Sequence, residues 1–556
     1  MTTDKGDEMG TNEKNNNLLG GSFVKMAAIL AAAGLLVRVL GFLYRLPLTN
    51  MIGNRGNGIY SAGYYIYNFF LIMSSAGLPV AISKMISEKI AYGEYTNAKK
   101  IFKVSMLVSG GLSFLCALIM AIGTTLLRYY CETNNVTDSL WYRSTWCLYS
   151  LSPTIFIVGI MAVYRGYFQG FNTTVPTAVS QLIEQIFNAF FSVYLAWLLV
   201  GYGVEFGAAG GTMGTGIGAL AGLFILVFYY IKSKKSRNAI YADDKRNYRI
   251  EGNREIALNL AKIAIPIITG TAIFSMTNFV DMAMVDSRLA AAGFDAKKIE
   301  DLYGQLTGKY VTLSTLPVSI STAVATAVIP SIAASMARKE HKIVQSKVDT
   351  ALRVTMMISI PAAAGLGALG RQILEMLFPR YPEGGVLITV GSFSVIFLAL
   401  SQISTGVLQG IGKVKTPAYN ALWGALTKIP VNYVLIAIPQ INVVGAVIST
   451  TVCYIVCSVL NFRALVKATG VKPDYVGMLV KPGISAAAMS AGAIGSYYGI
   501  FALVPSNTFA VLAAILIAMM VYLAAMILVK GFKKEDLKMM PAGTKLIGLL
   551  EKINRI

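Results

Sequence analysis

Long apolar runs constrain this chain more than any other feature. A helix that spans the hydrocarbon of a bilayer needs roughly 20 mostly apolar residues. The chain has 556 residues, of which 55% are hydrophobic and 13% charged, and its mean hydropathy is +0.61. Apolar stretches long enough to span begin near residues 24, 59, 104, 147, 176, 206, 257, 306, 352, 386, 418, 443, 476 and 507. We therefore predict an all-α polytopic membrane protein with about 14 transmembrane helices.

The strongly basic composition raises the question of a nucleic-acid partner. The formal net charge is +21, from 48 Lys and Arg against 27 Asp and Glu. Most of these cations fall in the tails and in every second loop, as the positive-inside rule expects of cytoplasmic segments. We therefore expect both termini in the cytoplasm, contacts with anionic membrane lipids at basic runs such as 231–237, and no nucleic acid.

Two short motifs recur at a nearly constant separation. "LPVAIS" at 78–83 returns as "LPVSIS" at 316–321, and "YFQGFNTTVP" at 167–176 returns as "VLQGIGKVKTP" at 407–417. The separation spans an even number of predicted helices, so both copies cross the membrane in the same direction. We predict two parallel six-helix repeats around a central cavity, followed by two C-terminal helices.

The predicted domain organisation follows from these repeats and from the polar stretches between them. It consists of a disordered cytoplasmic tail (1–22), a first lobe with helices one to six (23–231), a cytoplasmic linker (232–254), a second lobe with helices seven to twelve (255–467), helices thirteen and fourteen (468–532), and a second cytoplasmic tail (533–556). Rocking of the two lobes is the motion that this arrangement permits.

Proline and glycine mark two predicted helices of the first lobe and one of the second. Pro79 and Pro317 lie in the repeated motif, where each removes a backbone hydrogen bond that lipid cannot replace. We expect both prolines beside a cavity or hinge, although a kinked packing helix is the alternative. Glycine at every fourth residue from Gly210 to Gly222 indicates close helix packing.

Two arginines lie inside the first predicted helix. Arg38 and Arg45 are two helical turns apart, so they share one face with Gly41 and Phe42. A charge at mid-membrane costs roughly 3 to more than 10 kcal/mol, and such residues usually face a partner or a wet cavity. Snorkelling is an alternative for Arg45. Because a guanidinium group fits phosphate oxygens bidentately, we predict a cavity that binds a phosphate or pyrophosphate.

Further cations lie near the cytoplasmic side of the first lobe. Lys84 follows the "LPVAIS" motif and Arg165 lies on helix four, although either can also mark the inner end of a helix. Few buried acids are present to neutralise them, chiefly Glu184 and Asp281. The predicted substrate-binding residues are Arg38, Arg45, Lys84 and Arg165.

The second lobe contains a buried acid and a buried amine, Asp281 and Lys428. They form an ion pair, or Asp281 binds a cation such as Na⁺ with oxygens from nearby polar side chains. An ion pair that only fixes packing is a third reading. The candidates for ion coupling are Asp281, Lys428, Asn432 and Thr450, with Asn278 as a further oxygen donor.

Several of these motifs together resemble a known group of transporters. They are "RVLGFLYRLPLTNMIG" in helix one, "AGLPVAISKMISEK" closing helix two, and "LQG" or its variant "FQG" with a following proline after helices ten and four. With the plan of two six-helix repeats plus two helices, they resemble the MurJ and stage V sporulation protein B branch of the multidrug, oligosaccharidyl-lipid and polysaccharide exporter superfamily. The resemblance covers the chain from about residue 22.

The resemblance implies a flippase that moves lipid-linked peptidoglycan precursor, lipid II, from the inner to the outer leaflet of the bacterial plasma membrane by alternating access. The role would lie in cell-wall or spore-cortex synthesis, and we expect a monomer. In that family a cationic cavity holds the pyrophosphate, and the last two helices form a groove for the isoprenoid tail. Arg38 and Arg45 match the helix-one arginines, and Lys84 lies at or beside a helix-two arginine. A helix-eight arginine of the family is replaced by Thr312 here, with Lys309 the nearest cation.

The resemblance also bears on energy coupling. Some relatives bind sodium with an acid in helix seven and polar residues in helices eleven and twelve. Asp281 fits the acid, but Lys428 departs from the pattern, and its ammonium group can stand in for the ion. We therefore hypothesise an Asp281–Lys428 pair and expect no cofactor, with sodium or the membrane potential as possible couplings.

Other functions fit the sequence less well. An exporter of another lipid-linked oligosaccharide, of the capsule or O-antigen type, needs the same pyrophosphate contacts and stays open. A cation-coupled multidrug exporter usually has an acidic cavity. An enzyme is not expected, because the sole histidine, His341, lies in a charged loop and no phosphate-binding loop or zinc signature is present. Whether Cys131 and Cys147 pair is left open.

Overall fold

The computed structural model describes residues 30, 32–242, 244, 248–326 and 329–538, and every regular element among them is a helix. The first half contains a helix at Ala32–Leu43, α2 (Arg45–Ser75), α3 (Leu78–Ala91), α4 (Tyr95–Thr133), α5 (Leu140–Gly170), α6 (Val175–Leu199), the short η1 (Val200–Tyr202), α7 (Val204–Lys232) and α8 (Lys234–Ala242). The second half contains α9 (Asn253–Ala291), α10 (Ala296–Gly304), the π-helical η2 (Gln305–Val311), α11 (Thr312–Thr326), α12 (Ile329–Ala337), α13 (His341–Leu377), α14 (Gly385–Gly410), α15 (Lys415–Leu435) and α16 (Val444–Thr469). The π-helical η3 (Val476–Val480), α17 (Lys481–Leu503), α18 (Asn507–Leu528) and α19 (Lys534–Lys538) follow.

Eleven stretches of the described chain are long and apolar enough to cross a membrane. All fourteen stretches expected from the sequence lie on helical residues, the first of them from Ala32 onward. The eighth predicted span contains η2 and α11, and α15 carries Lys428 and Asn432 inside its apolar run. The all-α membrane fold is confirmed, while the number fourteen stays a prediction.

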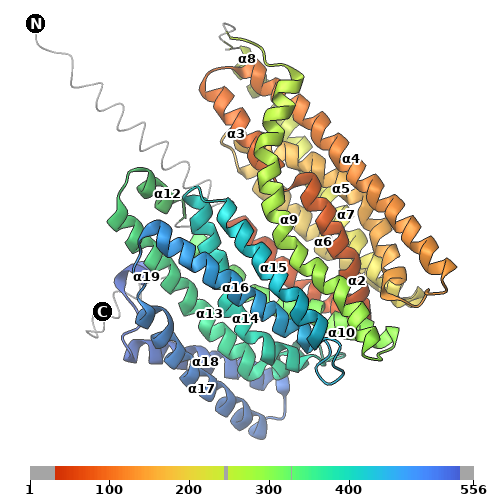
Figure 1. Ribbon diagram of the computed structural model, residues 1–556, viewed down its shortest axis with the longest axis vertical. Coiled ribbons are helices and arrows are strands. Elements are labelled where there is room, and N and C mark those ends of the chain that lie inside the picture. Colours follow the sequence, from red (N-terminus) through yellow and green to blue (C-terminus); the bar gives the residue numbers. More distant parts are fainter. Residues whose placement is uncertain (1–29, 31, 243, 245–247, 327–328, 539–556) are drawn as a thin grey trace, which may run out of the picture.

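The helices form two groups that α9 connects (Figure 1). Helices α2 to α7 make up one group, and α13 to α18 make up the other. Helix α9 contacts α2, α3 and α4 of the first group and α15 of the second. The structure therefore has two bundles with α9 between them, and the predicted lobe boundaries, 23–231 and 255–467, stay a prediction.

The turns that follow α5 and α14 support the internal repeat. After α5, the backbone N–H groups of Phe171, Asn172 and Thr173 donate to the carbonyl oxygens of Tyr167, Gln169 and Phe168. After α14, the N–H groups of Ile411, Gly412 and Lys413 donate to those of Val407, Gln409 and Leu408. Asn172 and Gly412 both adopt a left-handed backbone, with φ of 54° and 85°. Both copies of the motif thus end a helix in the same way.

Helices α2 and α10 are in tight contact at the end of the molecule that carries α10, which we name the α10 end. A Cβ atom built on Gly304 would lie 1.7 Å from the carbonyl oxygen of Asn54, and one on Gly58 would lie 2.3 Å from that of Glu300. Only glycine permits this backbone contact between α2 and α10. Glu300 is buried there, with its carboxylate 2.9 Å from Arg55 and 3.4 Å from Arg143.

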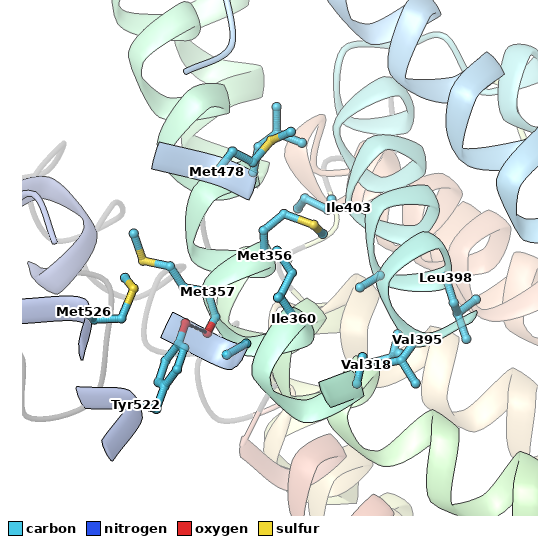
Figure 2. Close-up of a cluster of buried hydrophobic side chains, with 14 of the residues drawn as sticks. Val318, Met356, Met357, Ile360, Val395, Leu398, Ile403, Met478, Tyr522 and Met526 are labelled. Atoms are coloured by element: carbon cyan, nitrogen blue, oxygen red, sulfur yellow. Dashed lines mark hydrogen bonds between the residues drawn. The ribbon is translucent and has the colours of Figure 1, made fainter. Parts of the chain in front are cut away.

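The last two long helices pack on the second group. Figure 2 shows part of the apolar core that α11, α13 and α14 share with η3 and α18, and the Tyr522 hydroxyl donates to the carbonyl oxygen of Met357 at 2.8 Å. An apolar cavity of about 450 Å³ lies between α11, α13, α17 and α18. Helices α17 and α18 are thus held against α13, and the lipid-tail groove that the resemblance implies for them stays a prediction.

Two segments predicted as linker and tail contain packed residues. In the linker, the carbonyl oxygen of Arg249 accepts a hydrogen bond from Asn97 of α4 at 3.1 Å. In the tail, Asp536 is fully buried and its carboxylate lies 2.7 Å from the guanidinium of Arg353. The sequence did not reveal either contact, because both depend on residues far apart in the chain.

Candidate functional site

A cavity of about 250 Å³ lies between the two halves of the chain, and arginine and hydroxyl side chains contribute to its lining. The first helix and α2 form one wall, and η2 and α11 form the other. Its lining residues are Arg38, Gly41, Phe42, Arg45, Ser61, Tyr64, Tyr65, Thr307, Val311, Thr312, Thr315, Leu316 and Ser319. The cavity thus has a cationic wall from the first half of the chain and a wall rich in hydroxyl groups from the second.

Arg38 and Arg45 line this cavity together with Gly41 and Phe42, as a shared helical face requires. Arg38 is exposed, and its Nη1 lies 3.5 Å from the carbonyl oxygen of Ser319 across the cavity. The guanidinium of Arg45 lies over the ring of Tyr60, 4.7 Å from its centre. Neither arginine forms an ion pair with a carboxylate of the described residues. Two positive charges therefore remain available to an anion in this space.

The hydroxyl wall includes the position at which the resemblance predicts an arginine. Thr312 lines the cavity, whereas Lys309 is buried and points away from it. The Lys309 ammonium donates to the carbonyl oxygens of Glu383, at 2.7 Å, and of Tyr381. Lys309 therefore does not replace the missing arginine in this conformation.

Lys84 and Arg165, the other two predicted substrate ligands, lie away from the cavity in this conformation. Lys84 is exposed on α3. The guanidinium of Arg165 forms an ion pair with Glu184 at 2.6 Å and donates to the hydroxyl of Ser180 at 3.2 Å. The structure brings Arg38 and Arg45 together but not Lys84 or Arg165, so a binding role for the latter two stays a prediction.

The two prolines of the repeated motif differ in position. Pro79 lies in the first turn of α3, where a missing N–H breaks no helical hydrogen bond, so the interruption expected there is instead the α2–α3 junction at Ala76 and Gly77. Pro317 lies inside α11 and lines the apolar cavity beside α13 and α18. Neither proline lines the arginine cavity, which is formed by other residues of α2 and α11.

Asp281 of α9 and Lys428 of α15 form the ion pair that the sequence suggested. The Lys428 ammonium lies 2.6 Å from Oδ2 of Asp281, and the Asn432 amide donates to Oδ1 at 2.9 Å. Ser449 in turn donates to the Asn432 carbonyl oxygen. The hydroxyl of Thr450 donates to the backbone of its own helix at 2.7 Å.

The ammonium group of Lys428 neutralises Asp281 in this arrangement. Donors occupy both carboxylate oxygens of Asp281, and the ammonium group of Lys428 stands where a coordinated cation would lie. The exposed fractions of the two side chains are 14% for Asp281 and 2% for Lys428, so the pair is largely removed from solvent. The carboxylate and the amine are thus each other's counter-ion in this conformation.

Some features of the site were not predicted from the sequence. Tyr60, Tyr64 and Tyr67 follow one another at helical spacing on α2, and their rings are in contact, with centroid separations of 5.8 and 5.6 Å. Their spacing alone was a usable signal for an aromatic face next to the arginine stripe. The sequence contains no such signal for the ion pairs of Glu300 with Arg55 and Arg143, because the three residues come from three different helices. Cys131 and Cys147, left open above, are free thiols.

Two helical repeats with a cavity between them, lined in part by arginines, are the architecture of a membrane transporter. The chain belongs to the family described as polysaccharide biosynthesis protein, whose model matches residues 23–336, and a second model, MatE, matches residues 308–434. Within the multidrug, oligosaccharidyl-lipid and polysaccharide exporter superfamily, its relatives place it in the MurJ and stage V sporulation protein B branch. The family is one of transporters, in agreement with the expectation that the chain is not an enzyme.

Two curated relatives come from Bacillus subtilis (strain 168). The chain is 26% identical to stage V sporulation protein B over 448 residues, which cover 80% of the chain and 84% of that relative. It is also 26% identical to the lipid II flippase MurJ over 469 residues, which cover 82% and 84%. In fold, the chain is similar to a solved lipid II flippase MurJ in an inward closed conformation, with a TM-score of 0.62 and 17% identity over 90% of the chain and 98% of that structure.

Proposed function

We propose that this protein is a flippase that moves a lipid-linked diphosphate glycan, most specifically the peptidoglycan precursor lipid II, from the inner to the outer leaflet of the bacterial plasma membrane. The observation that carries the proposal is the pair of arginines, Arg38 and Arg45, that line a cavity between the lobes without a carboxylate partner among the described residues. Two relatives of the chain, stage V sporulation protein B and MurJ, support the substrate class.

The proposed mechanism needs no covalent chemistry. The guanidinium groups of Arg38 and Arg45 replace water around the diphosphate, which otherwise cannot enter the bilayer. The headgroup passes through the space between the lobes, and the isoprenoid tail stays in lipid or along the apolar cavity beside α17 and α18. We take the α10 end as the outer side and both termini as cytoplasmic, so the structure corresponds to a state closed toward the outside.

Two alternatives differ in the substrate. A flippase for a capsule or O-antigen unit would use the same arginines, because the cavity contacts described here concern the diphosphate and not the sugars. The match of the MatE model to residues 308–434 favours a multidrug exporter as the other alternative. Two unpaired guanidinium groups in the cavity oppose that reading, because they repel cationic drugs.

Headgroup translocation tests the proposal directly. The full-length protein is reconstituted in liposomes with fluorescent lipid II, and accessibility of the headgroup to a membrane-impermeant quencher is followed over time. We expect translocation by the native chain and a loss of at least about tenfold in Arg38→Ala, since a charge-assisted contact contributes about 1.5–3 kcal/mol. Arg371→Ala, which removes an exposed arginine outside the cavity, is the matched comparison. Efflux of a cationic dye without lipid II translocation would contradict the proposal.

We further propose that Lys428 takes the place of a coupling cation, so that transport needs no sodium. The ammonium group already neutralises Asp281, and together with the Asn432 amide it donates to both carboxylate oxygens. Translocation rates should be equal in sodium and choline buffers and should fall in Asp281→Asn, because the variant leaves Lys428 buried without its counter-ion. A strict sodium requirement, or normal transport by Asp281→Asn, would contradict this assignment. In the same assay, the membrane potential is the next candidate driving force to test. We also expect the protein to act as a monomer.

A further inference from the structure

The two cavity arginines differ in how they are held. Arg38 is exposed and lies at the limit of hydrogen-bond distance, 3.5 Å, from the Ser319 carbonyl oxygen. Arg45 is half-buried, and its guanidinium carbon lies 4.7 Å from the ring centre of Tyr60. A guanidinium over an aromatic face is attracted by the negative face of the ring, and the attraction grows when water is excluded. The ring therefore fixes Arg45 without neutralising its charge.

The chain path explains why these two residues meet. Gly53 interrupts α2 with a left-handed backbone, at φ of 69°, and turns the chain between the end of the first span and the start of the second. Arg45 and Tyr60 lie eight and seven residues from this glycine, so they reach a similar depth on facing segments. A side chain at Gly53 is also excluded by the ring of Tyr381, 2.9 Å from a Cβ built there.

Tyr60 itself has little freedom to move. It is fully buried, and its ring is stacked on that of Tyr64 at 5.8 Å with an interplanar angle of 14°. On α7, a Cβ built on Gly211 would lie 3.3 Å from the Tyr60 ring, so the absence of a side chain there makes room for the ring. Because the Tyr60 ring is immobile, it also fixes the position of the Arg45 guanidinium that lies over its face.

We propose that Tyr60 is a positioning residue that holds the Arg45 guanidinium ready for the diphosphate, a role that rests on the proposed function. An aromatic face suits this task better than a carboxylate does. A carboxylate would orient the arginine but also compete with the phosphate for its donors, as Glu184 does for Arg165. The ring attracts the cation through its face and leaves the N–H groups at the guanidinium edge available for phosphate oxygens.

The test is a double-mutant cycle on the full-length protein in lipid nanodiscs, with a fluorescent polyprenyl diphosphate as the probe. Tyr60→Phe keeps the ring and should bind within about twofold of the native chain, whereas Tyr60→Leu should bind about 3 to 30 times more weakly. In an Arg45→Met background, Tyr60→Leu should have no further effect, because the residue acts through Arg45. Equal weakening by Tyr60→Leu in both backgrounds would overturn the proposal.

A matched control separates positioning from general stability. Tyr67 is another buried tyrosine of α2, with an exposed fraction of 2%, and its ring contacts Tyr64. Tyr67→Leu should lower thermal stability about as much as Tyr60→Leu while leaving probe affinity unchanged within about twofold. Loss of affinity in Tyr67→Leu equal to that in Tyr60→Leu would also overturn the proposal, because a loosened α2 would then explain both results.

A second measurement covers the case in which Tyr60→Leu does not fold. Mono-, di- and trifluorinated phenylalanine at position 60 keep the shape of the ring but progressively weaken its negative face. We expect probe affinity to fall stepwise along this series, and a flat series would overturn the proposal. Failure of the proposed function looks different, because Arg45→Met itself would then leave binding of the probe unchanged.

Discussion

The two halves of the chain treat the cations within their helical bundles in opposite ways. In the first half, Arg38 and Arg45 line a cavity and have no carboxylate partner among the described residues. In the second half, Lys309 and Lys428 are almost fully buried, with ammonium groups bound to backbone carbonyls or to Asp281. The internal repeat has thus diverged into a lobe with two cavity arginines that lack a carboxylate partner among the described residues and a lobe whose two buried lysines bind groups of the protein itself.

This contrast teaches that the count of buried cations in a membrane protein says little about ligand charge. What matters is whether each cation already has a counter-charge or a full set of acceptors. Arg165 illustrates the point within the first lobe, because its partner Glu184 removes it from the set of free cations.

The largest effect on stability is expected from breaking the Asp281–Lys428 pair. Lys428→Met leaves a largely buried carboxylate without its counter-ion and should destabilise the protein by about 3–5 kcal/mol. The measurement is denaturant or thermal unfolding in detergent. Asp281→Leu combined with Lys428→Met should recover most of the loss, and Arg371→Met, in an exposed pair with Glu375, should cost less than about 1 kcal/mol. An equal loss in Arg371→Met would contradict the claim that burial makes the Asp281–Lys428 pair important for stability.

The next largest effect is expected on binding. Arg45→Ala should weaken binding of a polyprenyl diphosphate by about 10 to 100 times, because a charge-assisted contact to phosphate is lost. Its unfolding free energy should change by less than about 1 kcal/mol, since no carboxylate loses a partner. The two measurements on the same purified variant check the contrast with Lys428→Met. A large stability loss with normal binding would reverse the assignment of the first lobe.

A smaller effect is expected for Lys309. Lys309→Met removes the donor to the carbonyl oxygens of Tyr381 and Glu383 and should destabilise the protein by about 1–2 kcal/mol. Probe affinity should stay within about twofold of the native value, because the ammonium group does not line the cavity. Weakened binding without a change in stability would show instead that Lys309 reaches the ligand in another conformation.

The smallest effect is expected with acid, at a site outside the membrane. The ammonium of Lys533, at 2.7 Å, and the N–H of Gly477 hold the pKa of Asp474 below its usual value. A lowered pKa in the folded state means that the stabilisation is present above the usual pKa range and is lost as pH falls through the folded-state value. Because the pair is partly exposed to solvent, Asp474→Asn should cost about 0.2–1 kcal/mol at pH 7 and less near pH 3. A cost that does not change with pH would contradict this ionic role.

Sequence reasoning succeeded where the signal was local and periodic. The helices followed from apolar runs, the shared face of Arg38 and Arg45 from their seven-residue spacing, and the tight α6–α7 contact from the glycine stripe. A Cβ built on Gly214 would lie 2.3 Å from Ser192 of α6, which shows how close the two helices pack. The polarity of the Asp281 and Lys428 positions also sufficed to suggest their pairing.

Sequence reasoning failed where the signal depended on a partner distant in the chain. Arg165 looked like a free cation until Glu184 was found beside it, and Lys309 looked like a substitute ligand until its acceptors in the segment after α13 were known. The position of Pro79 depended on where α3 begins, which the apolar run around it conceals. These are tertiary facts, and no local pattern encodes them.

The seam between α2 and α10 has a consequence for studying how the transporter moves. Gly58 and Gly304 let the backbones of α2 and α10 touch. A single methyl group at either position would therefore clash with the opposite backbone and disfavour this contact. Such a substitution needs no cross-linker or antibody, and it shifts the conformational equilibrium toward states in which α2 and α10 are separated. A single alanine at Gly58 or Gly304 thus gives access to the conformer of the transport cycle in which α2 and α10 are apart.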